Sequence, residues 1–232
     1  MKLSLISISN LETVLSTCAV AGIDTIIIED GAIRGINDDK SCIIISDKNV
    51  PELPENTKLG LSRLGNLSSR LSLFRADPQL AVDAKENDRG EISTLEISSP
   101  SGKVQFRATS SALIKAPKKV NDVEKYVVTI GKDSVPFILQ GSKAMGAKNV
   151  VIASKKDGVY IECTDTNQDV FSTRVAEPQA DIFANTYKAD VLLALLKAAC
   201  VSETVNMSIG EVGTLSIEVN GHNLIILPQV QG

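Results

Sequence analysis

The chain has 232 residues, of which 43% are hydrophobic and 22% are charged, and its formal net charge is −4. These proportions are typical of a soluble globular protein, and no apolar run approaches the roughly 18 residues that a membrane span needs. Because Trp is absent and aromatic residues make up only 3%, the core must be built from Ile, Val and Leu. A net acidic chain is not typical of a simple nucleic-acid-binding protein, which usually has a basic balance.

The first half of the sequence shows a strand–helix–strands pattern twice. Apolar residues after Ser9 or Asn10, which are good helix N-caps, follow the helical period until Gly22. After the proline-bearing linker 50–56, a second helical pattern covers 63–74 and stops before Pro78. The predicted strands of this half are 3–8, the two sides of a turn at Asp30–Gly31, 42–45, 59–61, 79–82, 92–97 and 104–107.

The second half repeats the same pattern. Helices are predicted over 135–145, with Pro136 tolerated only in the first turn, and over 189–200. The segment 178–184 is predicted to be a link. The predicted strands are 126–130, the two sides of a turn at Asp157–Gly158 within 150–163, 170–175, 206–209, 215–219 and 224–227, the last two joined at Asn220–Gly221.

A long-period repeat relates the two halves. The segments 21–38 and 145–165 each contain a small residue with Gly, three β-branched apolar residues, an Asp-Gly and a closing Asp. The alternative is coincidence between two ordinary hairpins. A repeat of this kind predicts two copies of one domain. The expected fold is α+β, with two tandem similar domains at 1–111 and 125–232 joined by a connector at 112–124. Each domain contains two strand–helix–strands units, with the helices on one face of antiparallel sheets.

No residue constellation for catalysis or for a metal is present. Cys18, Cys42, Cys163 and Cys200 lie apart in apolar contexts and are expected to be buried, and the single histidine, His222, is expected in a turn. The segment GSKAMG at 141–146 lacks the residue order of a phosphate-binding loop. The sequence therefore predicts no enzyme activity, no catalytic residue, no metal site and no cofactor.

The positive charges gather in the helical regions. The windows 57–75 and 141–156 contain Lys and Arg and no acid, whereas the hairpin region 77–91 is mainly acidic. Basic helices on a common surface would hold DNA through sequence-independent, salt-sensitive contacts with phosphates. The alternative is that these side chains are only the solvated faces of amphipathic helices.

These features together resemble the DNA sliding clamps, and among them most closely the polymerase processivity clamps of tailed bacteriophages, which are similar to proliferating cell nuclear antigen. The resemblance rests on the MKLS start, the short length, the runs 9–38 and 126–165 and the connector 113–120. It covers the whole chain by pattern, since clamps have no short signature motif. The absence of Lys and Arg from 9–22 departs from the family pattern.

The resemblance implies a ring of three copies that encircles duplex DNA without sequence specificity and tethers a DNA polymerase, with a clamp loader as a further partner. Edge strands at 104–108 and 170–175 of successive copies would pair. The implied subunit interface consists of Val104, Phe106, Ala108, Val170, Ser172 and Val175. The implied DNA-facing residues are Lys58, Arg63, Arg70, Lys132, Lys143, Lys148, Lys188 and Lys197.

The resemblance also implies an apolar pocket for partner peptides. Its residues would be Ile43, Ile45, Leu113, Ile114, Leu227, Pro228 and Val230. Ile43 and Ile45 could equally be ordinary core residues. The resemblance further implies a viral protein that acts in the cytoplasm of the infected host cell, without membrane association. The alternative function is a non-DNA oligomeric scaffold for protein interactions, built on the same repeat.

Overall fold

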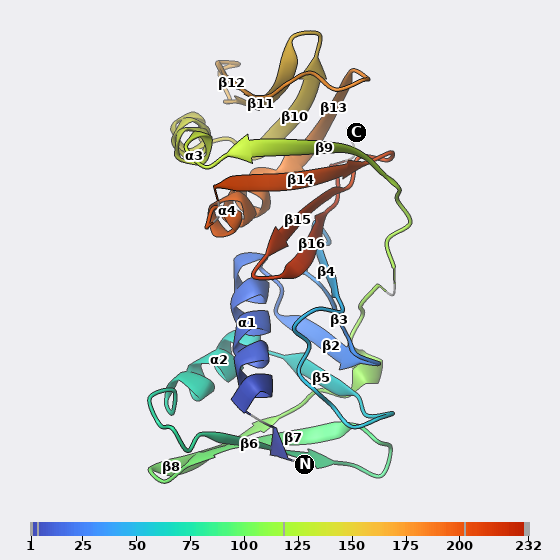
Figure 1. The fold of residues 1–232 in the computed structure, drawn as a ribbon, viewed down its shortest axis with the longest axis vertical. Helices are drawn as coiled ribbons and strands as arrows, with labels where there is room; N and C mark the ends of the chain where they lie inside the picture. Colours follow the sequence, from blue (N-terminus) through green and yellow to red (C-terminus); the bar gives the residue numbers. More distant parts are fainter. Residues whose placement is uncertain (1, 4, 118, 202, 230–232) are drawn as a thin grey trace. The chain divides into compact units, whose positions relative to one another are not determined.

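The computed structural model describes residues 2–3, 5–117, 119–201 and 203–229, with side chains from Ile8 onward. Two compact units are present (Figure 1). The first unit comprises Met1–Asp38, Ile43–Lys119 and Asn220–His222, and the second comprises Asp39–Cys42, Val120–Val219 and Asn223–Gly232. Each unit combines two helices with antiparallel strands, so the predicted α+β class with paired strand–helix–strands units is confirmed.

In the first unit, helix α1 (Leu5–Val20) packs against helix α2 (Leu64–Ser72). One set of strands has the order β1-β6-β7-β8 and the other has the order β5-β2-β3-β4. The strand bounds are β1 Lys2–Leu3, β2 Thr25–Glu29, β3 Ala32–Ile36, β4 Cys42–Ser46, β5 Leu59–Ser62, β6 Ala81–Glu86, β7 Ile92–Ser99 and β8 Gly102–Arg107. A 3-10 turn, η1 (Ser111–Leu113), begins the connector.

In the second unit, helices α3 (Ser134–Met145) and α4 (Ala189–Ala199) pack against each other and against the strands. One sheet has the order β12-β11-β10-β13, and the other strands follow the order β16-β15-β14-β9. The strand bounds are β9 Glu124–Gly131, β10 Asn149–Lys155, β11 Gly158–Thr164, β12 Val170–Ala176, β13 Phe183–Lys188, β14 Thr204–Gly210, β15 Leu215–Val219 and β16 His222–Ile226.

The core consists mainly of aliphatic side chains, as the composition predicts, and it also contains the fully buried rings of Phe106 and Tyr187. Helix α2 buries Leu64, Leu67 and Leu71, which recur at intervals of three and four and so share one helix face. Three of the four cysteines are buried, whereas Cys200 is half-buried.

The start of the chain differs from the prediction. Helix α1 begins at Leu5, inside the predicted strand 3–8, and only Lys2–Leu3 pairs as a strand. Ser9 and Asn10 therefore lie within the helix and do not cap it. The side-chain amide of Asn10 donates instead to the carbonyl of Val50 at 3.3 Å. A short run of alternating apolar residues fits either structure, so the period alone could not decide.

Two of the three predicted hairpin turns have the expected backbone. Asp30–Gly31 and Asn220–Gly221 adopt positive φ at both residues, which is the geometry of a tight hairpin turn. At the third, the turn lies at Lys156–Asp157, and Gly158 is the first residue of β11, opposite Lys155. A Cβ at Gly158 would lie 2.9 Å from the carbonyl oxygen of Ala176, so this glycine permits close strand packing.

Two further predictions are wrong. Residues 183–184, assigned to a link, begin strand β13, which pairs with β10. His222, expected in a turn, is the first residue of β16; it is fully buried, with Nδ1 3.1 Å from the Ser46 hydroxyl oxygen.

The backbone of Thr109 lies close to Gly60 of strand β5, so a substitution of Gly60 tests this packing. The amide of Thr109 donates to the carbonyl of Gly60 at 2.9 Å, and a Cβ at Gly60 would lie 2.2 Å from the Thr109 carbonyl oxygen. We expect Gly60→Ala to lower the free energy of unfolding by about 1–3 kcal/mol, because backbone cannot yield as a side chain can. The matched control is Gly65→Ala in α2, where a Cβ meets no atom within 4 Å. That variant should be neutral or stabilising by up to about 1 kcal/mol in urea unfolding.

Candidate functional site

Strand β8 forms an open edge of its sheet. It is the last strand in the order β1-β6-β7-β8 and pairs only with β7. The amide of Ala108 donates to the carbonyl of Ser93 on the β7 side at 3.0 Å. Because hydrogen-bonded and non-hydrogen-bonded pairs alternate along an antiparallel ladder, Gln105 and Arg107 turn their backbone groups away from β7.

Two arginines of the α2 region occupy this edge. The Arg63 guanidinium donates to the Arg107 carbonyl at 3.2 Å, and the Arg70 guanidinium donates to the Gln105 carbonyl at 3.3 Å. Their charged centres lie 5.1 and 5.3 Å from the ring centroid of Phe106, which is fully buried. Cation–π attraction therefore adds to the hydrogen bonds in holding both side chains at the edge of β8.

The start of α2 positions Arg63. Its φ is +58°, in the left-handed region, and its own side chain makes no capping bond. The carboxylate of Asp24 accepts instead from the amides of Arg63 and Leu64, at 3.2 and 2.9 Å. A carboxylate at a helix N-terminus satisfies free amides and complements the helix dipole. This cap fixes the point from which Arg63 reaches β8.

Strand β12 forms the corresponding open edge in the second unit. It ends the order β12-β11-β10-β13 and pairs only with β11. Val170, at its start, is 63% exposed. The rings of Phe137 on α3 and Phe171 on β12 lie 5.4 Å apart, and Phe137 is 56% exposed. An apolar surface therefore borders this edge.

Lys188 is a predicted DNA-facing residue that is engaged by acids. Its ammonium contacts the carboxylate of Asp39 and lies 3.5 Å from that of Asp190. The ammonium of Lys188 and the hydroxyl of Ser41 lower the pKa of Asp39 to about 2, and the same ion pair raises the pKa of Lys188. Most of the charge of Lys188 is therefore compensated within the second unit.

The remaining predicted lysines of this unit are less engaged. Lys132, between β9 and α3, lies 3.8 Å from the exposed carboxylate of Glu203. Lys143 and Lys197 occupy the last turns of α3 and α4, where a cation complements the helix dipole, and Lys148 lies in the α3–β10 loop. All three are exposed, and none forms an ion pair with any described residue.

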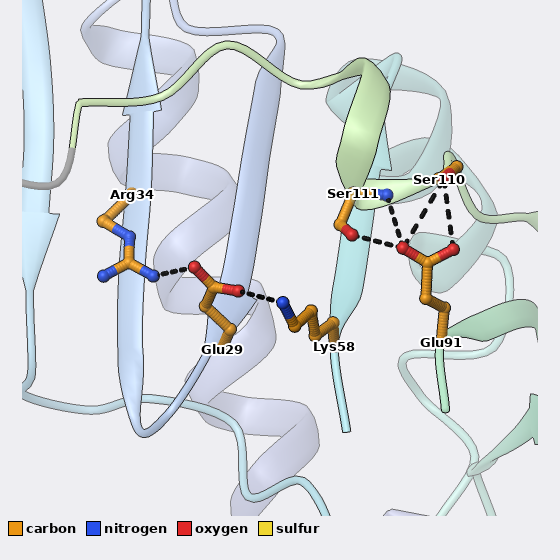
Figure 2. Close-up of polar contacts among 6 residues, drawn as sticks. All are labelled: Glu29, Arg34, Lys58, Glu91, Ser110 and Ser111. Atoms are coloured by element: carbon orange, nitrogen blue, oxygen red, sulfur yellow. Dashed lines mark hydrogen bonds and ion pairs between the residues drawn. The ribbon is translucent and has the colours of Figure 1, made fainter. Parts of the chain in front are cut away.

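Lys58 is paired with the half-buried carboxylate of Glu29. Figure 2 shows the Glu29 carboxylate between the Arg34 guanidinium and the Lys58 ammonium. The Lys58 nitrogen lies 3.2 Å from the carboxylate oxygen, and the side chains of Glu29 and Arg34 are only 13% and 14% exposed. Burial acts to raise the pKa of Glu29, but the hydrogen bond from Lys58 and the charges of both cations outweigh it, so the pKa is lowered.

A second carboxylate fixes the start of the connector. Figure 2 shows Glu91 accepting hydrogen bonds from both Ser110 and Ser111. The amide of Ser111 donates to the same carboxylate at 3.1 Å. The hydroxyl of Ser111 is the largest cause of the lowered pKa of Glu91. Backbone bonds from Lys58 to Gly90 and from Ile92 to Lys58 align this hairpin with the segment that leads into β5.

A third carboxylate fixes the end of the connector. Asp122 accepts from the amides of Val212 and Thr214, both at 3.1 Å, and from the Thr214 hydroxyl at 2.6 Å. Burial acts to raise the pKa of Asp122, but these hydrogen bonds lower it overall. Carboxylates therefore anchor both ends of the connector, one in each unit.

The residues predicted to form an apolar pocket differ in exposure. Leu113, in the connector, is 76% exposed, whereas Ile43 is only 4% exposed and lies in the core of β4. Ile45, Ile114, Leu227 and Pro228 are half-buried. Val230 lies outside the described residues. The structure thus presents Leu113 as the exposed apolar side chain of this set.

Other features that could carry chemistry are sparse. A cavity of about 510 Å³ lies between the Asp30–Gly31 turn and the linker 50–57, and it contains none of the predicted site residues. Within the described residues, no group of three or more His, Cys, Asp or Glu side chains could hold a metal ion. Over the same residues, no helix is both long and apolar enough to span a bilayer.

Sequence reasoning missed the anchoring carboxylates Glu29, Asp39, Glu91 and Asp122. Each was simply one acid among many in its local sequence. Their partners lie far along the chain, as with Asp39 and Lys188 or Asp122 and Thr214. Only the proline-bearing connector and the acidic 85–91 hairpin were visible as features of the sequence.

Comparison with solved structures shows the fold. The chain matches archaeal PCNA of A. fulgidus bound to the C-terminal region of FEN-1, with 14% identity, a TM-score of 0.67 and coverage of 100% of this chain and 99% of that chain. PCNA of Entamoeba histolytica matches with 13% identity, a TM-score of 0.68 and coverage of 99% and 98%. The PCNA2–PCNA3 complex of Sulfolobus tokodaii matches with 14% identity, a TM-score of 0.68 and full coverage of both chains. No protein-family model and no curated protein sequence matches the chain. The fold is therefore that of the PCNA sliding clamps over the whole chain.

The Glu91 anchor predicts a pH-dependent connector. Its pKa lies below the ordinary value of 4.5, so its stabilising effect is complete above pH 4.5 and is lost as the pH falls through the folded-state pKa. We expect the Ser111 amide to lose protection from hydrogen exchange below pH 4.5, after correction for the intrinsic exchange rate.

Glu91→Gln should raise exchange at Ser111 about tenfold at neutral pH and remove this pH dependence, because a charged acceptor is replaced by a neutral one. Glu86→Gln, on the same hairpin and exposed, is the matched control and should leave exchange unchanged. Equal protection in all three proteins would show that Glu91 does not anchor the connector.

Proposed function

We propose that the protein is a DNA sliding clamp. Three copies would close head to tail into a ring around duplex DNA and tether a DNA polymerase, with a clamp loader opening the ring. The proposed domains are 1–111 and 125–232, joined by the connector 112–124. The proposed setting is a bacteriophage replication system in the infected host cell, and the role requires no catalysis by the clamp itself.

The observation that carries this proposal is one clamp fold with two open strand edges, β8 in one unit and β12 in the other. Within the described residues, each edge has backbone groups without a strand partner, and at β8 two of the edge carbonyls accept from Arg63 and Arg70. Complementary but unlike edges on one chain support head-to-tail contacts, which close into a ring when the rotation between copies permits. The proposed interface residues are Val104, Phe106 and Ala108 on one side and Val170, Ser172 and Val175 on the other.

The proposed DNA-facing surface centres on three exposed lysines. Lys143, Lys148 and Lys197 are exposed and form no ion pair with any described residue, so their charge is available to phosphates. Lys132 adds to them, and the carboxylate of Glu203 lies 3.8 Å from its ammonium nitrogen. Lys58, Arg63, Arg70 and Lys188 are engaged within the chain and are expected to contribute less.

The connector is the proposed site for partner peptides. Leu113 is an exposed apolar side chain directly after the Glu91 anchor, so it is presented by a segment held at both ends. A peptide from the polymerase or from the loader would bury Leu113 together with Ile114. A few buried apolar anchors supply most of the affinity in such contacts.

A protein-interaction scaffold is the second candidate. The net charge of −4 and the pairing of five of the eight predicted DNA-facing residues with groups of the chain itself favour it. A scaffold would form oligomers but would not encircle DNA, so the two candidates differ in a topological property.

That difference gives a direct test. The protein would be loaded at high concentration on a nicked circular plasmid and then isolated by gel filtration at raised salt. A clamp should remain on the circle and leave when the plasmid is cut once, because it slides off the ends. Loss on both forms, or retention on both, would contradict encirclement.

Light scattering should give a mass three times 24.7 kDa that falls on dilution. A strict monomer would favour the scaffold, and a dimer would count against a ring of three.

The three exposed lysines provide a second test. Reversing Lys143, Lys148 and Lys197 to Glu should shorten retention on circular DNA at least about tenfold and reduce its dependence on salt, because each removes a phosphate contact. Lys188→Glu is the comparison variant, since the charge of Lys188 is already compensated by Asp39 and Asp190. Lys188→Glu should shorten retention on circular DNA less than a single reversal of Lys143, Lys148 or Lys197 does. The reverse order would overturn this assignment of the DNA-facing surface.

A further inference from the structure

The two arginines at the edge of β8 lie where an incoming strand would bind. Gln105 and Arg107 turn their backbone groups to the open edge, and their carbonyls already accept from Arg70 and Arg63. A side chain that occupies an edge carbonyl competes with any strand that pairs there. Charged side chains on an edge are also a common means of preventing unspecific strand addition.

We propose that Arg63 and Arg70 are subunit-association residues that hold the edge of β8 until strand β12 of a second copy adds to it, and that Asp169 of the incoming strand then pairs with them. This inference rests on the proposed assembly into a ring. It assigns the two arginines to the contact between copies and removes them from the DNA-facing set.

The backbone of β8 defines one half of the contact. The amide of Ala108, just after β8, donates to the carbonyl of Ser93, and Phe106, two residues earlier, lies opposite Leu95. By the alternation of an antiparallel ladder, Phe106 and Leu95 also bond to each other. The backbone amides and carbonyls of the intervening residues of the strand therefore point toward the open edge. These residues are Lys103, Gln105 and Arg107.

The backbone of β12 defines the other half. The amide of Asp165 donates to the carbonyl of Asp169 at 3.1 Å, so this pair exchanges a hydrogen bond. By the same alternation, Phe171 and Thr173 bond to β11. The residues of β12 whose backbone groups point toward the open edge are Val170, Ser172 and Arg174.

Three outward residues on each strand predict one complete register. An antiparallel pairing with Gln105 opposite Ser172 places Arg107 opposite Val170 and Lys103 opposite Arg174. The last two are both cations, but each has an acid of its own: Glu96 lies 3.8 Å from Lys103, and Glu177 lies 2.8 Å from Arg174.

Charge decides between the two directions of pairing. The edge of β8 is most positive at its end, where Arg107 and the guanidinium of Arg63 meet. The start of β12 is acidic, because Asp169 directly precedes Val170 and Asp165 lies across the turn. Asp169 is exposed, and its carboxylate has no hydrogen bond or ion pair with any described residue. Antiparallel pairing brings this carboxylate to the arginines, whereas parallel pairing would bring it to Lys103.

The exchange of partners makes the contact specific. In the free chain, the arginines satisfy two edge carbonyls and cover Phe106. A strand without a carboxylate at its start would displace them without offering a replacement. A strand with Asp169 offers a charge-assisted hydrogen bond in return, which is stronger than the bond to a carbonyl. The arginines therefore favour β12 of a second copy over other strands.

The test is a charge-swap series in the full chain, measured by sedimentation equilibrium. Arg63→Glu combined with Arg70→Glu should weaken association at least about tenfold, because like charges then meet at the edge. Asp169→Lys, an exposed change on the other edge, should weaken it similarly. Arg63→Glu combined with Asp169→Lys should restore association to within about threefold of the natural chain. Thermal unfolding by circular dichroism confirms that each variant is folded.

The matched control is Lys143→Glu combined with Lys197→Glu, which makes the same charge change on exposed helix ends. It should leave association unchanged and shorten retention on circular DNA. Association of the arginine variant equal to that of the natural chain would overturn the inference. So would a failure of Asp169→Lys to rescue Arg63→Glu. If the natural chain itself remains monomeric, the proposed ring fails, which is a separate result.

Discussion

The structure depends on how open strand edges are satisfied. A strand at the end of a sheet leaves every second amide and carbonyl without a partner in its own sheet. Strands β8 and β12 are both in this position, one in each unit. Water can satisfy such groups, but at β8 the chain uses Arg63 and Arg70 instead. This choice links the helix that precedes the edge, the buried ring of Phe106 and the exposed backbone in one arrangement that a second strand can reorganise.

Four carboxylates, three of them half-buried and one exposed, organise much of the rest of the molecule. Glu29 holds Lys58 and Arg34, Asp39 holds Lys188, and Glu91 and Asp122 fix the two ends of the connector. In each case hydrogen bonds lower the folded-state pKa, and at Glu29 and Asp39 nearby cations lower it further. These acidic residues therefore place loops and pair with particular cations. A chain of net negative charge can in this way keep a few exposed lysines, Lys143, Lys148 and Lys197, without an ion pair to any described residue.

The clamp fold and the charge placement together define the proposed function more narrowly than either does alone. Similarity at 13–14% identity establishes the fold over the full length. It does not establish which surface meets DNA. The proposal for that surface rests on exposure and pairing: Lys143, Lys148 and Lys197 are exposed, whereas Arg63 and Arg70 contact a strand edge. The proposed surface for DNA and the proposed contact between copies therefore use different cations.

The sequence by itself determined the repeat, the fold class and most of the elements. Asp30–Gly31 and Asn220–Gly221 specify tight turns through local backbone preference, and the leucines of α2 specify a buried helix face through their spacing. Local patterns could not place the start of α1 or strand β13, because a short apolar run fits both structures and pairing depends on a distant strand. Only the tertiary structure decided which cations are paired within the chain. Lys188 forms an ion pair with Asp39, and Arg70 donates to the carbonyl of Gln105, and both contacts join residues far apart in the chain. Charge is a property of the sequence, but whether a charge is free or paired depends on the fold.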